Sequence, residues 1–283
     1  MASAQPTHLE PSKLGTREYW DSLYTTEITN HAADPTDEGT VWFDDSDAEA
    51  RTLAFLDGIT ESASFDHEIR REDASFLDLG CGNGSLLFAL RDDGWRTGRM
   101  LGVDYSARSV ELARQIARAR KEGHRPAKKN DDDDEEETSD EEEDDTPMEG
   151  VEEEKETEIE FAEWDVLRGS YEVPLSGAQS SGWDVVLDKG TFDAICLSDE
   201  KDAATGARAC EGYKARVLRL VRPGGLFLVT SCNWTEEELG RWFQGPAGDV
   251  GSFAQVDRIN YPSFQFGGAK GQTISTLCFR REA

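Results

Sequence analysis

The sequence predicts an α/β fold with a mostly parallel, seven-stranded sheet that is closed at one edge by an antiparallel hairpin. From Ser75 onward, short apolar runs alternate with helical patterns, which is typical of βαβ units. The first apolar run leads directly into a glycine-rich turn. The last two runs, Phe253–Asn260 and Thr273–Phe279, leave no room for a crossover helix between them, so they must pair antiparallel.

Five other apolar runs supply the parallel part of the sheet. They are Ala74–Leu79, Arg99–Val103, Ile159–Trp164, Trp183–Leu187 and Leu226–Thr230. We expect one helix capped by Ser85 and a second capped by Ser106 that ends near Gly123. A third helix is expected over Ala207–Leu220, because a Pro-Gly-Gly sequence stops it shortly afterwards.

The chain is expected to form one globular unit with two parts. Residues 1–73 form an N-terminal arm with helices, and residues 74–283 form the α/β domain. The hydrophobic residues, 37% of the 283, are sufficient for a sizeable core. An insertion at about 126–158 interrupts the domain, and since it is dominated by Asp and Glu and has almost nothing to bury, we expect it to be disordered.

The net charge of −29 is concentrated in this insertion. Between Asp131 and Glu158 the chain carries 19 of its 59 acidic residues and a single base, Lys155. The rest of the chain is only moderately acidic. This charge balance argues against a nucleic-acid backbone or an anionic membrane as partner and favours a basic protein.

Other features of the composition exclude several classes of protein. No stretch is apolar for long enough to span a bilayer and the N-terminus lacks the regions of a signal peptide, so we expect a cytoplasmic protein, with access to the nucleus left open. Cys81, Cys196, Cys232 and Cys278 lie in or beside apolar segments and are expected to be reduced core thiols. The four histidines are scattered, so we expect no metal site.

The first candidate site is the glycine loop between Asp78 and Gly84. It follows a strand and precedes a helix, so its backbone can turn tightly and approach a ligand closely. Asp78, at the strand end, can hold the loop amides or the cationic amino group of a methionine moiety. The loop alone is a weak signal, because dinucleotide enzymes and purely structural turns share it.

Asp104 narrows the class of ligand. It stands at the end of the second strand, where a carboxylate can accept hydrogen bonds from both ribose hydroxyls of a nucleoside. Its structural alternative is a surface acid ahead of the helix capped by Ser106. A nicotinamide cofactor is the runner-up ligand, but the motif G-x-G-x-x-G would need glycine at the position of Ser85, and no Tyr-x-x-x-Lys pair follows.

Two further strand ends carry polar residues. Asp165 follows the third strand and can accept a hydrogen bond from adenine N6, with Val166 beside the ring; helix capping is its alternative role. The fourth strand delivers Asp188 and Lys189 to the same edge of the sheet. Asp188 is the candidate catalytic residue, because it can orient an incoming amine and accept its proton. Since a nearby carboxylate raises the pKa of an amine, steering without deprotonation is its alternative role. Lys189 neutralises Asp188 or Asp193, or is a solvated loop lysine.

Aromatic residues gather in the N-terminal arm. Trp20 and Tyr24 lie in one segment, and Trp42 and Phe43 follow after a polar loop. Aromatic faces attract ammonium and sulfonium groups, so these residues can cover a cofactor and line a cage for a cationic substrate. The alternative is simple packing of the arm onto the core.

Together, these segments resemble the lysine methyltransferases that modify translation elongation factor 1-alpha, which belong to the class I, seven-β-strand methyltransferases with a Rossmann-like fold. The resemblance covers nearly the whole chain outside the acidic insertion, which departs from the family's pattern. It rests on Ser12–Asp21, Trp42-Phe43, Leu77–Gly84, Gly102–Ser106, Leu187–Ile195 and Phe264–Gly268.

The resemblance implies S-adenosyl-L-methionine as cofactor and a lysine of the elongation factor as methyl acceptor. The cofactor contacts it implies are Trp20, Asp78, Gly80, Cys81, Gly82, Asn83, Asp104, Tyr105, Asp165, Val166 and Leu187. The acceptor side is assigned to Tyr24, Trp42, Phe43, Lys189, Thr191, Phe264 and Phe266. We expect a monomer without metal. A small-molecule or N-terminal amine methyltransferase and a non-enzymatic adaptor of the same fold are the alternatives.

Overall fold

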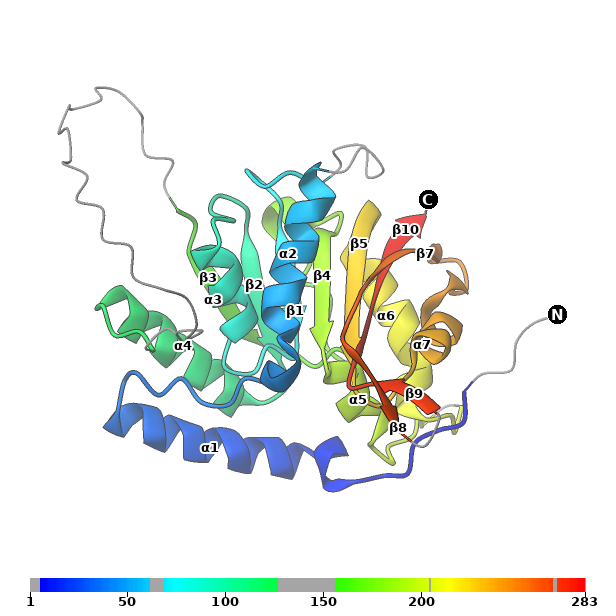
Figure 1. Cartoon of the computed structure of the whole chain (residues 1–283), viewed down its shortest axis with the longest axis horizontal. Coiled ribbons are helices and arrows are strands. Elements are labelled where there is room, and N and C mark those ends of the chain that lie inside the picture. The colour runs from blue at the N-terminus through cyan, green and yellow to red at the C-terminus, as the bar shows by residue number, and fades with distance from the viewer. Residues whose placement is uncertain (1–5, 62–68, 127–155, 204, 267–268, 283) are drawn as a thin grey trace.

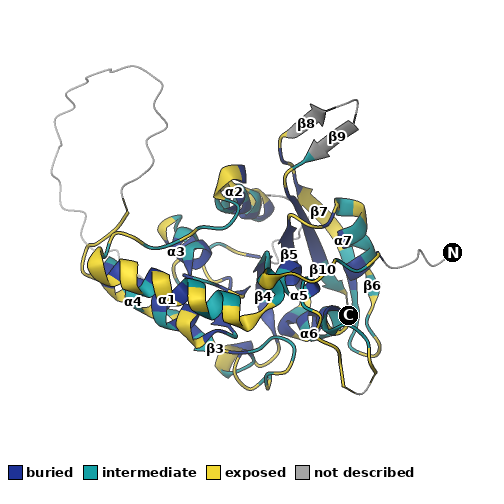
Figure 2. Ribbon diagram, turned by 90° about the horizontal axis from the view of Figure 1, so that it is seen from below, coloured by how far each residue is buried: buried dark blue, intermediate teal, exposed yellow. Residues whose placement is uncertain are grey.

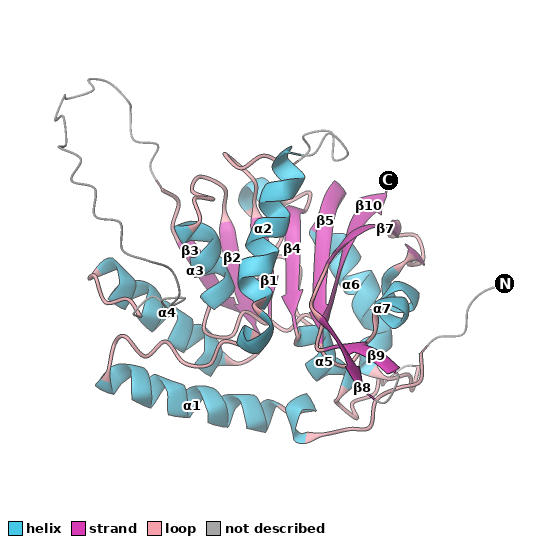
Figure 3. Ribbon diagram, viewed as in Figure 1, coloured by secondary structure: helices cyan, strands magenta, loops and turns pink. Residues whose placement is uncertain are grey.

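The computed structural model describes residues 6–61, 69–126, 156–203, 205–266 and 269–282 (Figure 1). Within these ranges the chain forms a three-layer α/β fold, in which one sheet lies between two layers of helices (Figure 3). This arrangement confirms the prediction of an α/β fold. None of the described helices is long and apolar enough to cross a membrane.

The central sheet has eight strands in the order β3-β2-β1-β4-β5-β10-β7-β6. Its parallel half consists of β1 (Phe76–Leu79), β2 (Met100–Asp104), β3 (Ile159–Glu163), β4 (Trp183–Lys189) and β5 (Val221–Ser231). All neighbouring pairs of these five strands are parallel. The five predicted parallel strands are thus present, with boundaries that differ by a few residues.

The antiparallel end of the sheet is more elaborate than a hairpin with a plain loop. β7 (Ser252–Ile259) pairs antiparallel with β10 (Ser275–Glu282) as predicted, and β10 also pairs antiparallel with β5. The chain between β7 and β10 forms a second, two-stranded sheet of β8 (Ser263–Phe266) and β9 (Ala269–Gln272). Dark blue in Figure 2 marks the buried residues of β5 and β10. The two-residue strand β6 (Gly245–Pro246) completes the edge.

The helices divide between the two faces of the sheet. α2 (Ala48–Glu61), α3 (Ser85–Asp92) and α4 (Ala107–Lys121) cover one face, and α5 (Thr191–Cys196), α6 (Tyr213–Leu220) and α7 (Glu236–Phe243) cover the other. Neighbouring residues of a strand point to opposite faces, so Phe76 packs in the first core and Leu77 in the second. Each such fully buried side chain stabilises the fold by about 1.5–3 kcal/mol.

Two of the predicted helix starts need correction. Ser106 does cap α4, since its hydroxyl accepts a hydrogen bond from the N–H of Ser109 at 3.4 Å. The N-cap of α3, however, is Gly84 in the left-handed conformation, and Ser85 is already the first helical residue. The helix predicted over Ala207–Leu220 starts with a 3-10 turn and becomes α-helical only at Tyr213.

The N-terminal arm lies across the carboxyl edge of the parallel strands. Its helix α1 (Arg17–Ala33) packs against α4 (Figure 1). Behind α1, Glu38 accepts two hydrogen bonds of 2.5 Å from the guanidinium group of Arg120 in α4. Such paired, charge-assisted hydrogen bonds are strong and directional, so they fix the arm over the sheet edge.

The acidic insertion is shorter than predicted at its C-terminal end. Thr157 donates a backbone hydrogen bond of 3.0 Å to the carbonyl of Arg96, and its hydroxyl donates one of 2.7 Å to Thr97. Residues 156–158 therefore lead into β3 as part of the fold. Residues 127–155, on which most of the prediction of disorder falls, lie outside the described residues.

Candidate active site

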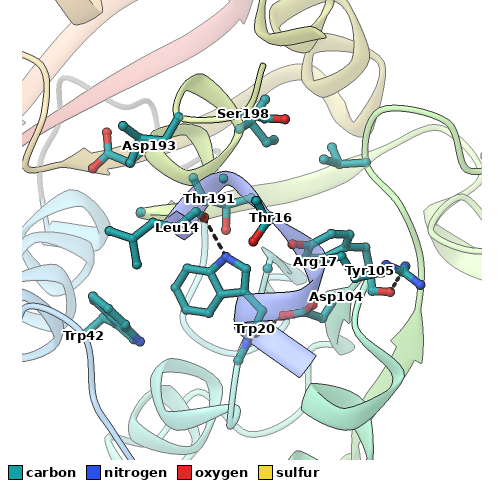
Figure 4. Close-up of a pocket in the computed structure, with 18 of the residues that line it drawn as sticks. Leu14, Thr16, Arg17, Trp20, Trp42, Asp104, Tyr105, Thr191, Asp193 and Ser198 are labelled. Carbon is teal, nitrogen blue, oxygen red and sulfur yellow. Dashed lines mark hydrogen bonds between the residues drawn. The ribbon is translucent and has the colours of Figure 1, made fainter. Parts of the chain in front are cut away.

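A cavity of about 600 Å³ opens at the carboxyl edge of the parallel strands, where open α/β sheets bind ligands (Figure 4). Its walls come from the glycine loop, the ends of β2 and β4, the turn after β3, α5, the loop after β5 and the N-terminal arm. Most predicted site residues line it: Trp20, Tyr24, Trp42, Phe43, Gly80, Cys81, Gly82, Asn83, Asp104, Tyr105, Asp165, Val166, Lys189 and Thr191.

The glycine loop has the backbone conformation that its sequence predicts. Gly80 and Gly82 have φ angles of 67° and 56°, in the left-handed region that side chains rarely adopt. Gly80 also leaves room for Thr191, because a Cβ at Gly80 would come within 2.0 Å of the Thr191 hydroxyl. That hydroxyl donates to the carbonyl of Leu79 at 2.7 Å. The ends of β1 and β4 are thereby held together.

Asp104 connects the glycine loop to the end of β2 at the cavity wall. Its carboxylate is 5% exposed and accepts hydrogen bonds from the backbone N–H groups of Ser106, at 2.8 Å, and Gly82, at 3.3 Å. Burial raises the pKa of Asp104 to about 6, although these hydrogen bonds favour the ionised form. Asp104 is therefore both a support of the loop and an acceptor that faces the cavity.

The arm covers this part of the cavity with aromatic rings. Figure 4 shows Trp20 between Trp42 on one side and Asp104 with Tyr105 on the other. The indole Nε1 of Trp20 donates to the carbonyl of Leu14 at 2.8 Å, and its ring centroid lies 5.3 Å from that of Trp42. The guanidinium group of Arg17 donates to the carbonyl of Tyr105 and lies over its ring. These contacts fix the arm above the cavity.

Tyr24 and Asn83 connect the arm to the glycine loop. A Cβ at Gly82 would lie 3.0 Å from the hydroxyl oxygen of Tyr24, so this phenol packs against the loop. The side-chain amide of Asn83 donates to the carbonyls of Glu38, at 2.8 Å, and Thr40, at 3.3 Å. The structure thus places Tyr24, predicted on the acceptor side, beside the loop predicted to bind the cofactor.

Asp165 has the capping geometry that was the alternative to ligand binding. One of its carboxylate oxygens accepts hydrogen bonds from the backbone N–H groups of Leu167, at 2.8 Å, and Arg168, at 3.2 Å. Asp165 and Val166 nevertheless line the cavity, as does Leu167. This capping therefore fixes the turn after β3 as part of the cavity wall.

Asp188, the predicted catalytic residue, does not line the cavity. It is 2% exposed, and its carboxylate accepts hydrogen bonds from the N–H groups of Thr191, at 2.8 Å, and Phe192, and from the hydroxyl of Tyr213. Burial raises the pKa of Asp188 to about 7. The structure therefore places this carboxylate behind the cavity wall, where it holds the turn from β4 into α5.

The buried acidic residue of this region that does line the cavity is Asp193. It accepts hydrogen bonds from the hydroxyl of Ser231, at 2.5 Å, and the N–H of Cys232, at 2.8 Å, and burial raises its pKa. Cys232 and Asn233 line the cavity and are exposed, so the prediction of a core thiol at Cys232 is wrong. The polar sequence Ser231-Cys-Asn233 directly after an apolar strand was the available signal for this side of the site.

Lys189 and Phe43 form the wall between the arm and β4. The ammonium group of Lys189 donates to the carbonyl of Trp42 at 3.2 Å and lies 3.4 Å from the carboxylate of Glu49. Its neutralising partner is thus Glu49, on α2. Phe43 has a φ of 65°, unusual for a large side chain, and its ring lies against Gly190. Such local strain often marks a functional site.

The remaining predicted residues are not brought to the cavity by described contacts. Asp78 and Leu187 are buried in β1 and β4 and do not line it, and burial raises the pKa of Asp78 to about 7. Phe264 and Phe266 belong to β8, but their side chains lie outside the described part of the chain. The proximity predicted for these two rings stays a prediction.

Comparisons with known proteins point to one class of enzyme. Residues 70–128 match a family model described as a methyltransferase domain. The chain is 35% identical to the protein-lysine N-methyltransferase EFM4 of Saccharomyces cerevisiae, over 97% of each chain. It is 30% identical to the human EEF1A lysine methyltransferase 2, over 96% of this chain and 88% of the relative.

A solved structure supports the fold. The magnesium protoporphyrin IX methyltransferase of Synechocystis, whose crystal structure contains bound S-adenosylmethionine, superposes with a TM-score of 0.50 at 15% identity, covering 96% of this chain and 98% of the other. At this identity the similarity concerns the fold alone. It agrees with the mostly parallel sheet and its antiparallel end.

Proposed function

Because this chain belongs to the family of protein-lysine N-methyltransferases that includes yeast EFM4 and human EEF1A lysine methyltransferase 2, we propose that it methylates a lysine of translation elongation factor 1-alpha. It is an S-adenosylmethionine-dependent enzyme with a Rossmann-like fold. The observation that carries the proposal is a cavity that is lined by two buried acidic residues, Asp104 at the end of β2 and Asp193 on α5.

The residues at the carboxyl edge fit S-adenosylmethionine. The bare backbone of Gly80 and Gly82 permits close approach, and Asp104 offers acceptors for the ribose hydroxyls. Asp165 and Val166 would hold the adenine ring. Trp20 would cover the sulfonium, to which an aromatic face is attracted. When bound, this cofactor would supply a methyl group whose carbon an amine attacks in line, with S-adenosylhomocysteine as the leaving thioether.

Residues of this chain must position the amine and exclude water on the other side of the cavity. We assign Trp42 and Phe43 to the wall around the aliphatic part of the acceptor lysine, and the carboxylate of Asp193 to its amine. A carboxylate in a buried site attracts a cationic amine strongly. As the ammonium group enters, it donates a hydrogen bond to Asp193, which orients the nitrogen toward the methyl donor. The proton then passes along this hydrogen bond to the carboxylate of Asp193, whose pKa burial raises, and a neutral amine remains.

Asp188 then has an indirect part in this proposal. Its hydrogen bonds to the backbone N–H groups of Thr191 and Phe192 fix the first turn of α5, which also carries Asp193. It is a positioning residue, because it contacts neither the cavity nor the acceptor. Lys189 likewise acts by holding Trp42 in place.

The proposal includes a cytoplasmic location and action as a monomer. The acidic character of the chain suits a basic protein substrate.

Radiolabelled S-adenosylmethionine tests the proposal. The purified protein should transfer label to recombinant elongation factor 1-alpha, and mass spectrometry of the product should find the methyl group on a lysine side chain. Asp193→Asn should reduce transfer strongly, while Asp249→Asn, the same change on the exposed loop between β6 and β7, should leave it intact.

Two results would contradict the proposal in different ways. If S-adenosylhomocysteine binds but the elongation factor gains no label, the substrate is wrong, and label on a small amine would favour the small-molecule alternative. If calorimetric titration with S-adenosylhomocysteine gives no heat and no thermal shift, the protein is a non-enzymatic adaptor.

A further inference from the structure

A second cavity, of about 700 Å³, lies beside the first. Its walls are the loop after β5, the first turn of α7, the end of β7 and the chain that enters β10 from the β8–β9 hairpin. Cys232 and Asn233 line both cavities. The two spaces therefore adjoin at Cys232 and Asn233, beside the carboxylate of Asp193.

Hydrogen bonds across the second cavity keep its walls in place. The carboxylate of Glu236, in the first turn of α7, pairs with Arg258 of β7 and accepts a hydrogen bond of 3.3 Å from the side chain of Gln272 at the end of β9. On the other side, the hydroxyl of Thr273 lies 2.9 Å from that of Ser46, a residue of the N-terminal arm. Contacts within this chain thus hold the groove in shape.

The charge that faces solvent along the groove is negative. Arg258 is its basic lining residue, and Glu236 already pairs with it. The side chain of Glu237 is 85% exposed, and its ion pair with Arg241 is long, at 3.8 Å. Asp45 is exposed as well, and its charge reaches the thiol of Cys232 at the junction of the two cavities. Carboxylates are therefore available on both sides of the junction.

We propose that this groove holds the stretch of substrate protein that carries the acceptor lysine, and that Glu237 pairs with a second basic residue next to that lysine. The inference rests on the proposed function, because the groove leads to the acceptor side of that cavity. Its size argues for a polypeptide, since a small amine would need only the first cavity. Complementary charges between such a groove and its substrate raise the rate of association and fix how the substrate chain is aligned, more than they add affinity.

Charge reversal tests the proposal. With folded elongation factor 1-alpha as substrate, Glu237→Lys should raise KM roughly three- to tenfold, with kcat and the affinity for S-adenosylhomocysteine unchanged. The increase should shrink at high salt, which screens exposed charges. Glu122→Lys is the matched control: it makes the same change at the exposed end of α4, which packs near the opposite edge of the sheet, and it should leave KM unchanged.

A compensating change in the substrate gives a second, independent test. Once the acceptor lysine is mapped, a basic residue beside it is replaced by glutamate, and this change should lower KM for Glu237→Lys while raising it for the wild-type enzyme. Thermal unfolding confirms that the variant is folded, and Glu237→Gln provides a milder change at the same position.

The outcomes separate this inference from the proposed function. The inference is overturned if the wild-type enzyme methylates the elongation factor but Glu237→Lys keeps the same KM. It is also overturned if Glu122→Lys raises KM equally, because the charge of Glu237 then has no specific part in binding the substrate. If the wild-type enzyme does not methylate the elongation factor, it is the proposed function that fails.

Discussion

The hydroxyl of Tyr213 donates a hydrogen bond to the carboxylate of Asp188, and both side chains are shielded from solvent behind the cavity wall. Tyr213 begins α6, whereas Asp188 lies near the end of β4. Their contact therefore couples the second helical layer to the strand that leads into the active site. A residue in this position influences activity through the geometry of α5.

Asp188→Asn should lower the free energy of unfolding by about 1–3 kcal/mol, because an amide NH₂ group would face donors that now have an acceptor. Tyr213→Phe removes one hydrogen bond and should cost about 1 kcal/mol. Denaturant titration measures both values. Asp188→Asn should keep its affinity for S-adenosylhomocysteine, and cooling should restore part of its turnover. Complete loss of turnover at unchanged stability would instead place Asp188 in contact with the substrate.

Asp78→Asn should stabilise the ligand-free protein at pH 8. The folded-state pKa of about 7 lies above the usual value near 3.9, so the folded state binds the proton more tightly and loses stability as pH rises between these two values. Removing the carboxylate should add about 1–3 kcal/mol at pH 8 and nothing near pH 4. Unfolding experiments at the two pH values measure this difference.

The same variant also tests the ligand role of Asp78. If the carboxylate meets the amino group of the cofactor, S-adenosylmethionine should raise the melting temperature of the wild-type protein more than that of Asp78→Asn. Equal shifts would mean that Asp78 serves only the fold.

Asp104→Ala should weaken binding of S-adenosylhomocysteine by about 1.5–3 kcal/mol, the value of hydrogen bonds to a charged group. Asp104→Asn separates the role of Asp104 in supporting the loop from its role in binding the ribose. The amide oxygen can still accept from the N–H of Ser106, while the charge is lost. Calorimetric titration measures both affinities. Unchanged affinity in both variants would reduce Asp104 to a support of the glycine loop.

Asp193→Asn should accelerate alkylation of Cys232. Burial and, next, the charge of Asp193 raise the pKa of this thiol to about 12, and the thiolate is the reactive form. Removing the charge lowers the pKa and increases the thiolate fraction at pH 8. Mass spectrometry follows the labelling, with Cys232→Ser as the control, because the other four cysteines are buried. Equal rates in Asp193→Asn and wild type would show that the two groups do not interact.

The parallel sheet was predictable because its strands are almost completely apolar and are followed by strong turn signals. Phe76–Leu79 has all four residues buried, and the glycines after it have the predicted backbone conformation. Asp104 and Asp165 were predictable for the same reason, since their positions at strand ends fix them at the carboxyl edge.

Residues whose role depends on packing between distant elements were not predictable in the same way. Asp188 and Asp193 both lie near the end of β4, and only the direction of each side chain decides which one reaches the cavity. The hydrogen bond from Tyr213, 25 positions away, holds Asp188 inward, and Ser231 and Cys232 hold Asp193 at the wall. The β8–β9 hairpin was missed because its glycine-bearing sequence is typical of a loop.

Gly80 and Thr191 have a consequence for the way this site changes by mutation. With only 2.0 Å between a Cβ at position 80 and the Thr191 hydroxyl, a side chain at position 80 would displace that hydroxyl from Leu79, whatever its polarity. The two positions are 111 residues apart in the sequence, yet the hydrogen bond of Thr191 depends on the residue at position 80. Because the φ of 67° at Gly80 disfavours a side chain even where space is made for it, variant libraries that diversify position 191 should keep glycine at position 80.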